Sequence, residues 1–331
     1  MYNQPYHDKD ISKALFLVTG GGGFIGSNIV EYLLKYNAGK VRVIDNFLTS
    51  NKKNLSSFLS HPNFELFEGD IRNLDFCRKA CEGIDYVTHQ AALGSVPRSL
   101  KEPFNTNDIN VGGFVNVLTA AKDAQVKQFV YASSSSVYGD EPTLPKSENK
   151  IGKQLSPYAV SKYTNELYAS VFHKSFGMNV IGLRYFNIFG PRQDPSGMYA
   201  AVIPIFVHKI MNKLDVFIDG DGEQTRDFTF VENAVQANIR AMLSDSNEAQ
   251  GEVFNIACGS KYSVNELYNK IQKVLAIDHQ SHYRPTREGD IRNSLADISK
   301  ASKMLAYNPA FDFNTGLEIT VNYFKNSYQQ D

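Results

Sequence analysis

The chain has 331 residues, of which 42% are hydrophobic, and a formal net charge of -1. It is long enough to bury one large core or two smaller ones, and its near-neutral charge favours neither nucleic acid nor an anionic membrane as a partner. No apolar run approaches the roughly 18–20 residues of a membrane span, and the first dozen residues are polar and of mixed charge, unlike a signal peptide. We therefore expect a cytoplasmic globular protein.

The first unit of the chain is an apolar run, 14–18, followed by three glycines spaced three apart. Gly20, Gly23 and Gly26 stand between this run and a helical pattern. Glycines allow a tight turn and a close approach of the backbone to a pyrophosphate, and the N-terminus of the next helix offers free N–H groups. The order strand, glycine turn, helix therefore predicts a dinucleotide site.

The next strand, 41–44, ends in the acidic residue Asp45. This residue lies roughly 20 positions beyond the glycine turn, where an acid can hydrogen-bond the adenosine ribose hydroxyls. A carboxylate at this place repels the additional phosphate of NADP. The preferred cofactor is therefore NAD.

Strand and helix signals continue to alternate along the chain. Further strands are predicted at 64–71, 86–92, 128–132 and 179–184, and a helix at about 111–124. Repeated βα units with one glycine turn in the first of them predict an α/β fold with a doubly wound parallel sheet. Sites in such sheets collect at the carboxyl ends of the strands.

Two features that suggest other chemistry are better explained structurally. His89 is a lone histidine at a buried strand end, and we expect a packed or hydrogen-bonded residue. Cys77 and Cys81 stand four apart in a helical pattern without a second Cys or His pair at ligand spacing, so we expect structural thiols and no metal site.

The most informative stretch runs from Ser133 to Lys162. It opens with four serines, and after about 25 residues Tyr158 and Lys162 follow, four apart at the start of a predicted helix, so that they share one face. A phenol has a pKa near 10 and acts as a base near neutrality only where positive charge favours the phenolate, which a lysine one turn away supplies. Our hypothesis is a serine–tyrosine–lysine proton-transfer site beside an oxidised nicotinamide.

The pattern changes after residue 186, where a loop rich in Gly, Pro, Arg and Asp begins. Short strands at 216–218 and 226–230, a sheet strand at 253–257 and a helix at 264–275 predict a smaller mixed α/β lobe. We expect an NAD-binding domain of residues 1–187 and 228–260 and a substrate lobe of residues 188–227 and 261–331. Arg226 and Arg287 are candidate partners of an anionic substrate, and structural ion pairs are the competing interpretation.

Together these motifs resemble the extended short-chain dehydrogenase/reductase superfamily. They are Gly20, Gly23 and Gly26, Asp45, Asp70, Gln90-Ala91-Ala92, the serine run and Tyr158 with Lys162. The resemblance covers essentially the whole chain, including 184–187 and 287–290. It is strongest to the nucleotide-sugar 4-epimerases, and the segments 90–99 and 192–195 are similar to the UDP-N-acetylglucosamine (UDP-GlcNAc) 4-epimerases of bacterial surface-polysaccharide pathways.

The resemblance implies a reaction at C4 of a UDP-sugar. NAD would oxidise C4, the 4-keto intermediate would turn over in the pocket, and hydride would return to its other face. Tyr158 would remove the C4 hydroxyl proton, Ser134 would align that hydroxyl, and Lys162 would lower the tyrosine pKa and hold the nicotinamide ribose. NAD would stay bound throughout, and a homodimer would form through the helices of Val111 and Tyr158.

The resemblance also implies two sets of binding residues. Those for the cofactor are Gly20, Gly23, Phe24, Ile25, Gly26, Asp45, Asn46, Asp70, Ile71, Gln90, Ala91, Ala92, Asn110, Tyr158 and Lys162. Those for the substrate are Gly94, Ser95, Arg98, Ser135, Ser136, Asn187, Gln193, Tyr199, Val202, Arg226, Arg287, Asp290 and Ser294.

Two serines separate this chain from relatives with other reactions. Dehydrating members carry an Asp-Glu pair just before the motif that is Val137-Tyr138-Gly139 here, and decarboxylating members carry a Glu at the second of these positions. Ser135 and Ser136 occupy them here. Elimination and decarboxylation need that additional acid–base group, so epimerisation is favoured over both. A non-catalytic NAD sensor is the alternative from another class, although such proteins commonly lack the tyrosine or the lysine.

The choice of sugar depends on Ser294. The matching position is bulky in relatives restricted to glucose and galactose and small in those that accept an N-acetyl group. The serine predicts interconversion of UDP-GlcNAc and UDP-GalNAc. The uronic acid of UDP-GlcNAc stays open, because Arg98 and Gln193 can serve an alcohol or a carboxylate at C6, and UDP-glucose or UDP-glucuronate is the alternative substrate.

Overall fold

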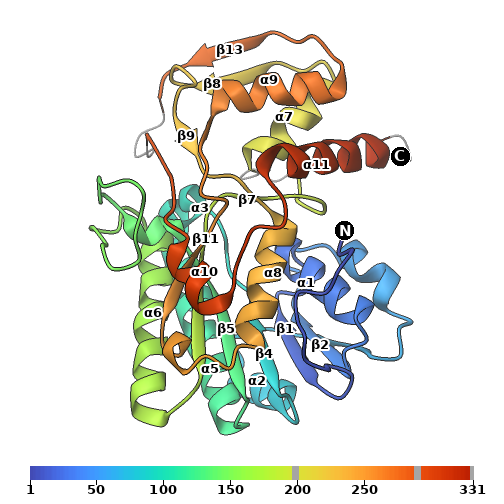
Figure 1. Ribbon diagram of the computed structural model, residues 1–331, viewed down its shortest axis with the longest axis vertical. Helices are drawn as coiled ribbons and strands as arrows, with labels where there is room; N and C mark the ends of the chain where they lie inside the picture. The colour runs from blue at the N-terminus through green and yellow to red at the C-terminus, as the bar shows by residue number, and fades with distance from the viewer. Residues whose placement is uncertain (196–200, 287–291, 329–331) are drawn as a thin grey trace.

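A seven-stranded parallel sheet forms the centre of the molecule. The computed structural model describes residues 1–195, 201–286 and 292–328 (Figure 1). The strands, in the order β3 (Phe64–Glu68), β2 (Lys40–Asp45), β1 (Leu15–Thr19), β4 (Tyr86–His89), β5 (Gln128–Ser134), β6 (Val180–Tyr185) and β11 (Val253–Ile256), are all parallel. The order reverses between β1 and β4, which confirms the doubly wound α/β sheet and marks the place where such sheets bind ligands.

Helices cover both faces of this sheet, which is why its strands are continuous apolar runs. One face carries α2 (Leu74–Cys81), α5 (Phe114–Asp123) and α6 (Pro157–Phe176), and the other carries α1 (Phe24–Lys35), α8 (Val231–Met242) and α10 (Ser299–Leu305). Short turns of helix, α3 (Val96–Lys101), α4 (Pro103–Asn107) and a π-helical turn (Asp108–Gly113), precede α5. No helix in the described parts of the chain is long and apolar enough to cross a membrane.

A smaller lobe lies beyond the carboxyl ends of the strands, at the top of Figure 1. It contains α7 (Val202–Met211), α9 (Val264–Leu275), α11 (Phe313–Tyr328) and two strand pairs, β8 (Val216–Asp219) with β13 (Ser281–Arg284) and β9 (Thr225–Arg226) with β12 (Tyr262–Ser263). The helix predicted at 264–275 has these bounds, and Ser263 and Glu266 form a capping box at its start. A further pair, β7 (Ile188–Phe189) with β10 (Thr229–Phe230), leads into α8.

The boundary between the sheet domain and the smaller lobe does not fall at single residues of the chain. The strand predicted at 226–230 consists of β9 and β10, which pair with different partners. Helix α10 belongs by sequence to the predicted lobe but packs against β11 and α8 of the sheet. The domain boundaries 1–187, 188–227, 228–260 and 261–331 stay a prediction.

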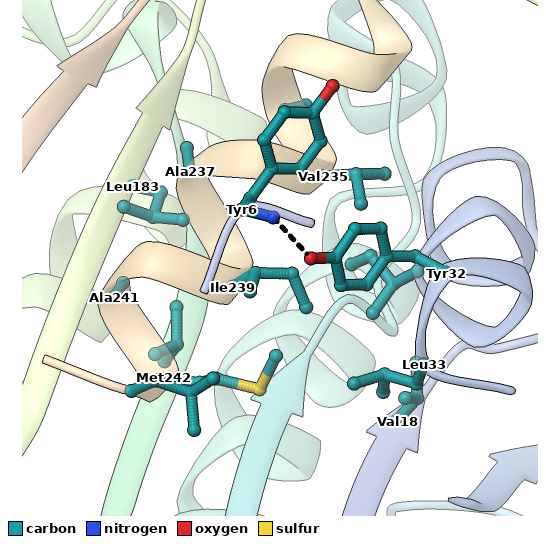
Figure 2. Close-up of a cluster of buried hydrophobic side chains, with 14 of the residues drawn as sticks. Tyr6, Val18, Tyr32, Leu33, Leu183, Val235, Ala237, Ile239, Ala241 and Met242 are labelled. Atoms are coloured by element: carbon teal, nitrogen blue, oxygen red, sulfur yellow. Dashed lines mark hydrogen bonds between the residues drawn. The ribbon is translucent and has the colours of Figure 1, made fainter. Parts of the chain in front are cut away.

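The first residues of the chain pack into the core, which their polar composition did not indicate. Tyr2 and Tyr6 are 0% and 4% exposed. Figure 2 shows the backbone N–H of Tyr6 donating to the hydroxyl of Tyr32 on α1, beside Val235 and Ile239 of α8; the N···O distance is 2.6 Å. The segment therefore covers the seam between α1 and α8.

A buried ion pair fixes α6 against the sheet. The guanidinium of Arg184 on β6 donates to both carboxylate oxygens of Glu166, at 2.9 and 2.8 Å, and the hydroxyl of Ser133 donates to the same carboxylate at 2.5 Å. Arg184 is 1% exposed and Glu166 is 7% exposed. Because Glu166 lies four residues after Lys162, the pair also determines which face of α6 is turned toward the strand ends.

Breaking this pair should strongly destabilise the protein. We expect Glu166→Gln to lower the free energy of unfolding by about 3 kcal/mol, because Arg184 is left buried without its counter-charge. Urea unfolding followed by circular dichroism measures the loss. The matched control is Glu68→Gln, whose partner Lys52 is 2.7 Å away but whose pair is more than half exposed; its loss should stay within about 0.5 kcal/mol. Equal losses would refute the assignment of Glu166 as an anchor of α6.

Candidate active site

The glycine turn joins β1 to α1 and is shaped for close backbone contact. Gly20 has a φ of +68°, and a Cβ atom there would lie 2.7 Å from the backbone nitrogen of Ala91. Gly26 packs against the backbone of Gly20, so that helix and strand approach closely. Gly23 is the N-cap of α1, and no side chain of the described residues caps the helix. Its first N–H groups are therefore available to a phosphate.

The carboxylate of Asp45 stands at the end of β2 and faces the glycine turn. It accepts hydrogen bonds from the backbone N–H of Gly22 (2.8 Å) and Phe47 (2.8 Å) and from the hydroxyl of Ser50 (2.7 Å). Two of these reach Oδ1 and one reaches Oδ2, so a carboxylate with about four acceptor positions retains capacity for a hydroxyl. Asp45 and the uncapped start of α1 thus fit the ribose and pyrophosphate of NAD.

The glycine-loop groove runs along the switch point of the sheet. Its lining includes the predicted cofactor residues Gly20, Gly23, Asp45, Asn46, Asp70, Ile71, Gln90, Ala91 and Ala92. It also includes residues that the sequence analysis did not single out, namely Ile44, Leu48, Thr49, Ser50, Gly69, Leu93 and Ile109. Most of these are close in sequence to predicted residues on the same strand ends. This closeness was the signal from which they could have been predicted.

Three polar residues at or near the groove are already engaged. The amide of Asn46 donates to Asp70 (2.9 Å), and hydrogen bonds from Arg72 lower the pKa of Asp70 to about 2. Asn110, in the π-helical turn, accepts from the N–H of Leu93 (2.7 Å) and donates to its carbonyl (3.2 Å) and to the hydroxyl of Ser161 (3.1 Å). These bonds hold the groove wall onto α6, and a direct contact of Asn110 with the cofactor stays a prediction.

The three predicted catalytic residues meet where β5 ends and α6 begins. Burial raises the pKa of Tyr158, and a hydrogen bond with the Ser134 side chain acts in the opposite direction. The Nζ atom of Lys162 lies 5.9 Å from the centroid of the Tyr158 ring and donates to the carbonyl of Ala132 at 2.9 Å. Burial lowers the pKa of Lys162 to about 8. The fold confirms that the three lie together; the lowering of the tyrosine pKa by Lys162 stays a prediction.

Serines occupy the turn beside this cluster. Ser135 and Ser136 open a 3₁₀ turn (Ser135–Tyr138), whose N-cap is the side chain of Ser134, accepting from the N–H of Ser136 at 3.1 Å. Within the described residues, the buried hydroxyl of Ser136 has no hydrogen-bond partner. Glu166 lies on the same helix as the tyrosine but is held by Arg184. The turn thus places hydroxyls, and no carboxylate, beside the cluster.

A cavity of about 520 Å³ lies between the lobe and the strand ends, and we call it the lobe cavity. It contains the predicted residues Asn187, Val202 and Arg226, together with Ile188, Phe189, Pro195, Ala201, Ile203, Ile205, Phe206, His208, Lys209, Phe217, Ile218, Asp219, Gln224, Phe228, Val264 and Arg284. A volume of this size holds a drug-sized ligand. The sequence analysis missed Lys209 because it did not predict α7.

Gln224 is a second residue of the lobe cavity that the sequence analysis missed. Its amide nitrogen donates to the carbonyl of Asp219 at 2.8 Å, whereas its buried oxygen has no partner in the described ranges. Its position two residues before Arg226 was the only available signal.

The other predicted substrate residues that the structure describes lie outside the lining of the lobe cavity. Ser95 caps α3 by accepting from the N–H of Arg98 (3.2 Å), next to Gly94. Ser294 donates its N–H to the carbonyl of Thr225 at 3.1 Å, beside the strand of Arg226. Gln193 lines a separate cavity with the predicted cofactor residues Gly23 and Phe24. Tyr199, Arg287 and Asp290 lie outside the described residues.

The histidine and the two cysteines have the structural roles expected of them. His89 is 1% exposed, its Nδ1 lies 3.0 Å from the hydroxyl of Thr19, and burial lowers its pKa to about 3. This confirms a packed residue. Cys77 and Cys81 are buried, and burial raises the pKa of each thiol to about 12, which makes them poor nucleophiles and ligands.

A doubly wound sheet with a glycine turn, an acid at the end of β2 and a Ser–Tyr–Lys cluster defines an NAD-binding enzyme. Residues 16–257 match the model of the NAD dependent epimerase/dehydratase family. The chain belongs to this family, NAD is its cofactor, and its relatives make it an isomerase.

Three relatives that align over nearly their full length show the range of UDP-sugars for which similar proteins are named. A putative UDP-glucose 4-epimerase of Methanocaldococcus jannaschii is 38% identical over 95% of this chain and 99% of its own. The structure of a UDP-N-acetylglucosamine 4-epimerase from Methanobrevibacter ruminantium is 41% identical, with a TM-score of 0.90 over 95% of this chain and 99% of its own. A UDP-glucuronic acid 4-epimerase from Bacillus cereus, solved with its substrate and NAD, is 32% identical, with a TM-score of 0.88 over 95% and 100%.

The geometry of the glycine turn predicts that Gly20→Ala weakens NAD binding by at least about tenfold. The added Cβ needs a left-handed conformation, costing roughly 1–2 kcal/mol, and meets the backbone of Ala91. Titration of NAD-free protein with NAD measures the affinity. The matched control is Gly83→Ala, because Gly83 has a φ of +71° but nothing within 4 Å of its Cβ position. It should lose about 1 kcal/mol of stability and keep its NAD affinity; equal effects on NAD would contradict the prediction.

Proposed function

We propose that this enzyme epimerises UDP-N-acetylhexosamines at C4, interconverting UDP-GlcNAc and UDP-GalNAc for surface-polysaccharide precursors. The observation that carries the proposal is the Ser134–Tyr158–Lys162 cluster beside a turn of hydroxyls without a carboxylate. Reversible transfer of a hydride at C4 needs one proton-transfer group, whereas elimination or decarboxylation needs an additional acid–base residue. A non-catalytic sensor gains nothing from retaining this cluster.

The residues of the cluster have distinct tasks. Bound NAD supplies the acceptor and the donor of the C4 hydride. Tyr158, in its phenolate form, takes the proton of the C4 hydroxyl, and Ser134 orients that hydroxyl. After the 4-keto sugar has rotated in the pocket, Tyr158 returns the proton. The positive charge of Lys162 favours the phenolate, and burial makes that charge effective over several ångströms.

The lobe cavity suits the nucleotide of the substrate. Arg226 and Lys209 line it beside Asn187, and cations at this place suit a diphosphate. Phe217 and Phe206 add apolar surface for the base and ribose. The roles of Gly94, Ser95, Arg98, Gln193 and Ser294 toward the sugar, and those of Tyr199, Arg287 and Asp290, are part of this proposal.

The N-acetyl preference has two supports. Ser294 is small and stands beside Thr225, next to the strand that carries Arg226 into the lobe cavity. The M. ruminantium neighbour, 41% identical, is named for UDP-N-acetylglucosamine. Other relatives are named for UDP-glucose or UDP-glucuronate, so these substrates are the second candidates, and the uronic acid of UDP-GlcNAc remains open.

We further propose a homodimer through the outer face of α6. Val160, Leu167 and Val171 are each about half exposed and recur at helical spacing on one side of this helix, with Tyr168 beside them. Such an apolar face suits a copy of the same helix and its neighbour α5.

The role of the tyrosine can be tested by Tyr158→Phe. We expect turnover of UDP-GlcNAc to fall by about 10²–10⁴-fold, because the proton-transfer group is gone, while NAD stays bound. UDP-GalNAc formation is measured by chromatography, and NAD content by absorbance after denaturation. Tyr163→Phe on the same helix is the control and should keep normal activity. Near-normal turnover of Tyr158→Phe would rule out the assigned base.

The choice of sugar can be tested with a panel of neutral and acidic UDP-sugars scored for inversion at C4. We expect Ser294→Tyr to lower kcat/KM for UDP-GlcNAc about tenfold more than for UDP-glucose, because the larger side chain removes room for the acetamido group. The same variant with UDP-glucose serves as its own control. Equal losses on the two sugars would exclude Ser294 as the determinant.

A further inference from the structure

Residues 1–13, which precede β1, have no role in the proposed chemistry, yet buried hydrogen bonds hold them to the folded core. The segment begins beside α1 and α8 (Figure 1). The hydroxyl of Tyr6 donates to Glu232 of α8 at 2.7 Å, and its backbone N–H donates to Tyr32 of α1 at 2.6 Å (Figure 2). These contacts fasten the segment to both helices.

Tyr2 is held by three further hydrogen bonds. Its N–H donates to Glu232 at 2.7 Å, its carbonyl accepts from the hydroxyl of Tyr36 at 2.8 Å, and its own hydroxyl donates to Oδ1 of Asn28 at 3.0 Å. Its φ of +60° lies in the left-handed region that side chains rarely adopt, so this arrangement depends on the surrounding contacts. Burial, assisted by the charge of Glu31, raises the pKa of Tyr2, which keeps the hydroxyl a donor.

Asn28 connects Tyr2 to the loop of Pro191, which leads to the lobe cavity. Its amide nitrogen donates to the carbonyl of Phe24 at 2.9 Å and to that of Pro191 at 3.3 Å. Carbonyl oxygens only accept, so the NH₂ group of Asn28 must face them and its oxygen must face the Tyr2 hydroxyl. Tyr2, Asn28 and Pro191 therefore form one chain of hydrogen bonds through α1, in which the direction of each bond is fixed.

The loop at the end of this chain, residues 190–195, separates two cavities. Pro195 lines both the lobe cavity and a second cavity, which also contains Gly23, Phe24 and Arg192. Arg192 forms an ion pair with Glu31 of α1. The position of this loop therefore sets the shape of the lobe cavity and of the space in front of the glycine turn.

We propose that Tyr2 is a positioning residue for substrate binding, which acts through Asn28 to hold the 190–195 loop against α1. The proposal rests on the proposed function in assigning the lobe cavity to the substrate, and it takes UDP-GlcNAc as the kinetic probe. A loosened loop leaves the Ser134–Tyr158–Lys162 cluster intact, so the effect falls on KM and not on kcat.

The test compares two variants that each remove one buried hydroxyl from the same segment. Tyr2→Phe breaks the chain to Pro191, whereas Tyr6→Phe breaks only a bond to Glu232. We expect Tyr2→Phe to raise KM for UDP-GlcNAc about three- to tenfold with kcat within twofold of wild type. Tyr6→Phe should leave both constants within twofold while lowering Tm by a similar amount. Equal changes of KM in the two variants would overturn the proposal.

Coupling through Asn28 is tested with a double-mutant cycle. After Asn28→Ala, the additional substitution Tyr2→Phe should change KM by less than about twofold, because the chain is already broken. Independent, multiplicative effects would mean that Tyr2 does not act through Asn28 and would refute the proposal.

Limited trypsin cleavage after Arg192 reports on the loop without any substrate. We expect faster cleavage there in Tyr2→Phe than in Tyr6→Phe or wild type, and equal rates would overturn the positioning role. This readout stays decisive if the wild-type enzyme converts none of the UDP-sugars tested, a result that would defeat the proposed function alone.

Discussion

The arrangement of the active site depends on the buried pair of Glu166 and Arg184. It joins α6 to β6, and the Ser133 hydroxyl joins β5 to the same carboxylate. Burying two charges costs several kcal/mol in lost solvation, so an apolar contact of the same size would stabilise the fold at least as well. What the pair adds is orientation: since Tyr158, Lys162 and Glu166 recur every four residues, fixing the last of them directs the other two toward Ser134.

The sheet and the Ser–Tyr–Lys cluster could be predicted because their signals are local. The glycine turn, the acid Asp45 and the apolar strands follow one another within single βα units, and a parallel sheet brings the carboxyl ends of its strands to one edge. Ser134 ends β5, and α6 begins at the same edge of the sheet, with Tyr158 in its first turn. Proximity of these side chains therefore follows from topology and needs no knowledge of distant contacts.

The lobe could be predicted only in outline, because long-range contacts determine it. The segment 226–230 is divided at Asp227, which is fully buried and accepts N–H bonds from Cys258, Gly259 and Ala296. Burial raises the pKa of this carboxyl to about 6. Nothing in the local sequence indicates these partners. Helix α8 escaped prediction for a related reason: nearly all of its residues are buried, and polar side chains among them, such as Glu232 and Asn233, bond to segments far along the chain.

We expect substrate choice in this scaffold to depend partly on anchors that lie outside the cavity. Relatives that match 95% of the chain are named for glucose, glucuronic acid and N-acetylglucosamine derivatives, so the shared fold does not decide among these sugars. Two segments near the cavity are held by buried polar side chains outside its lining: Asp227 accepts from Ala296, two residues after Ser294, and Asn28 donates to Pro191. Because cores deform little, such anchors transmit the position of the sheet to the loops, and we expect changes at the anchors to act on substrate choice in addition to changes at residues such as Ser294.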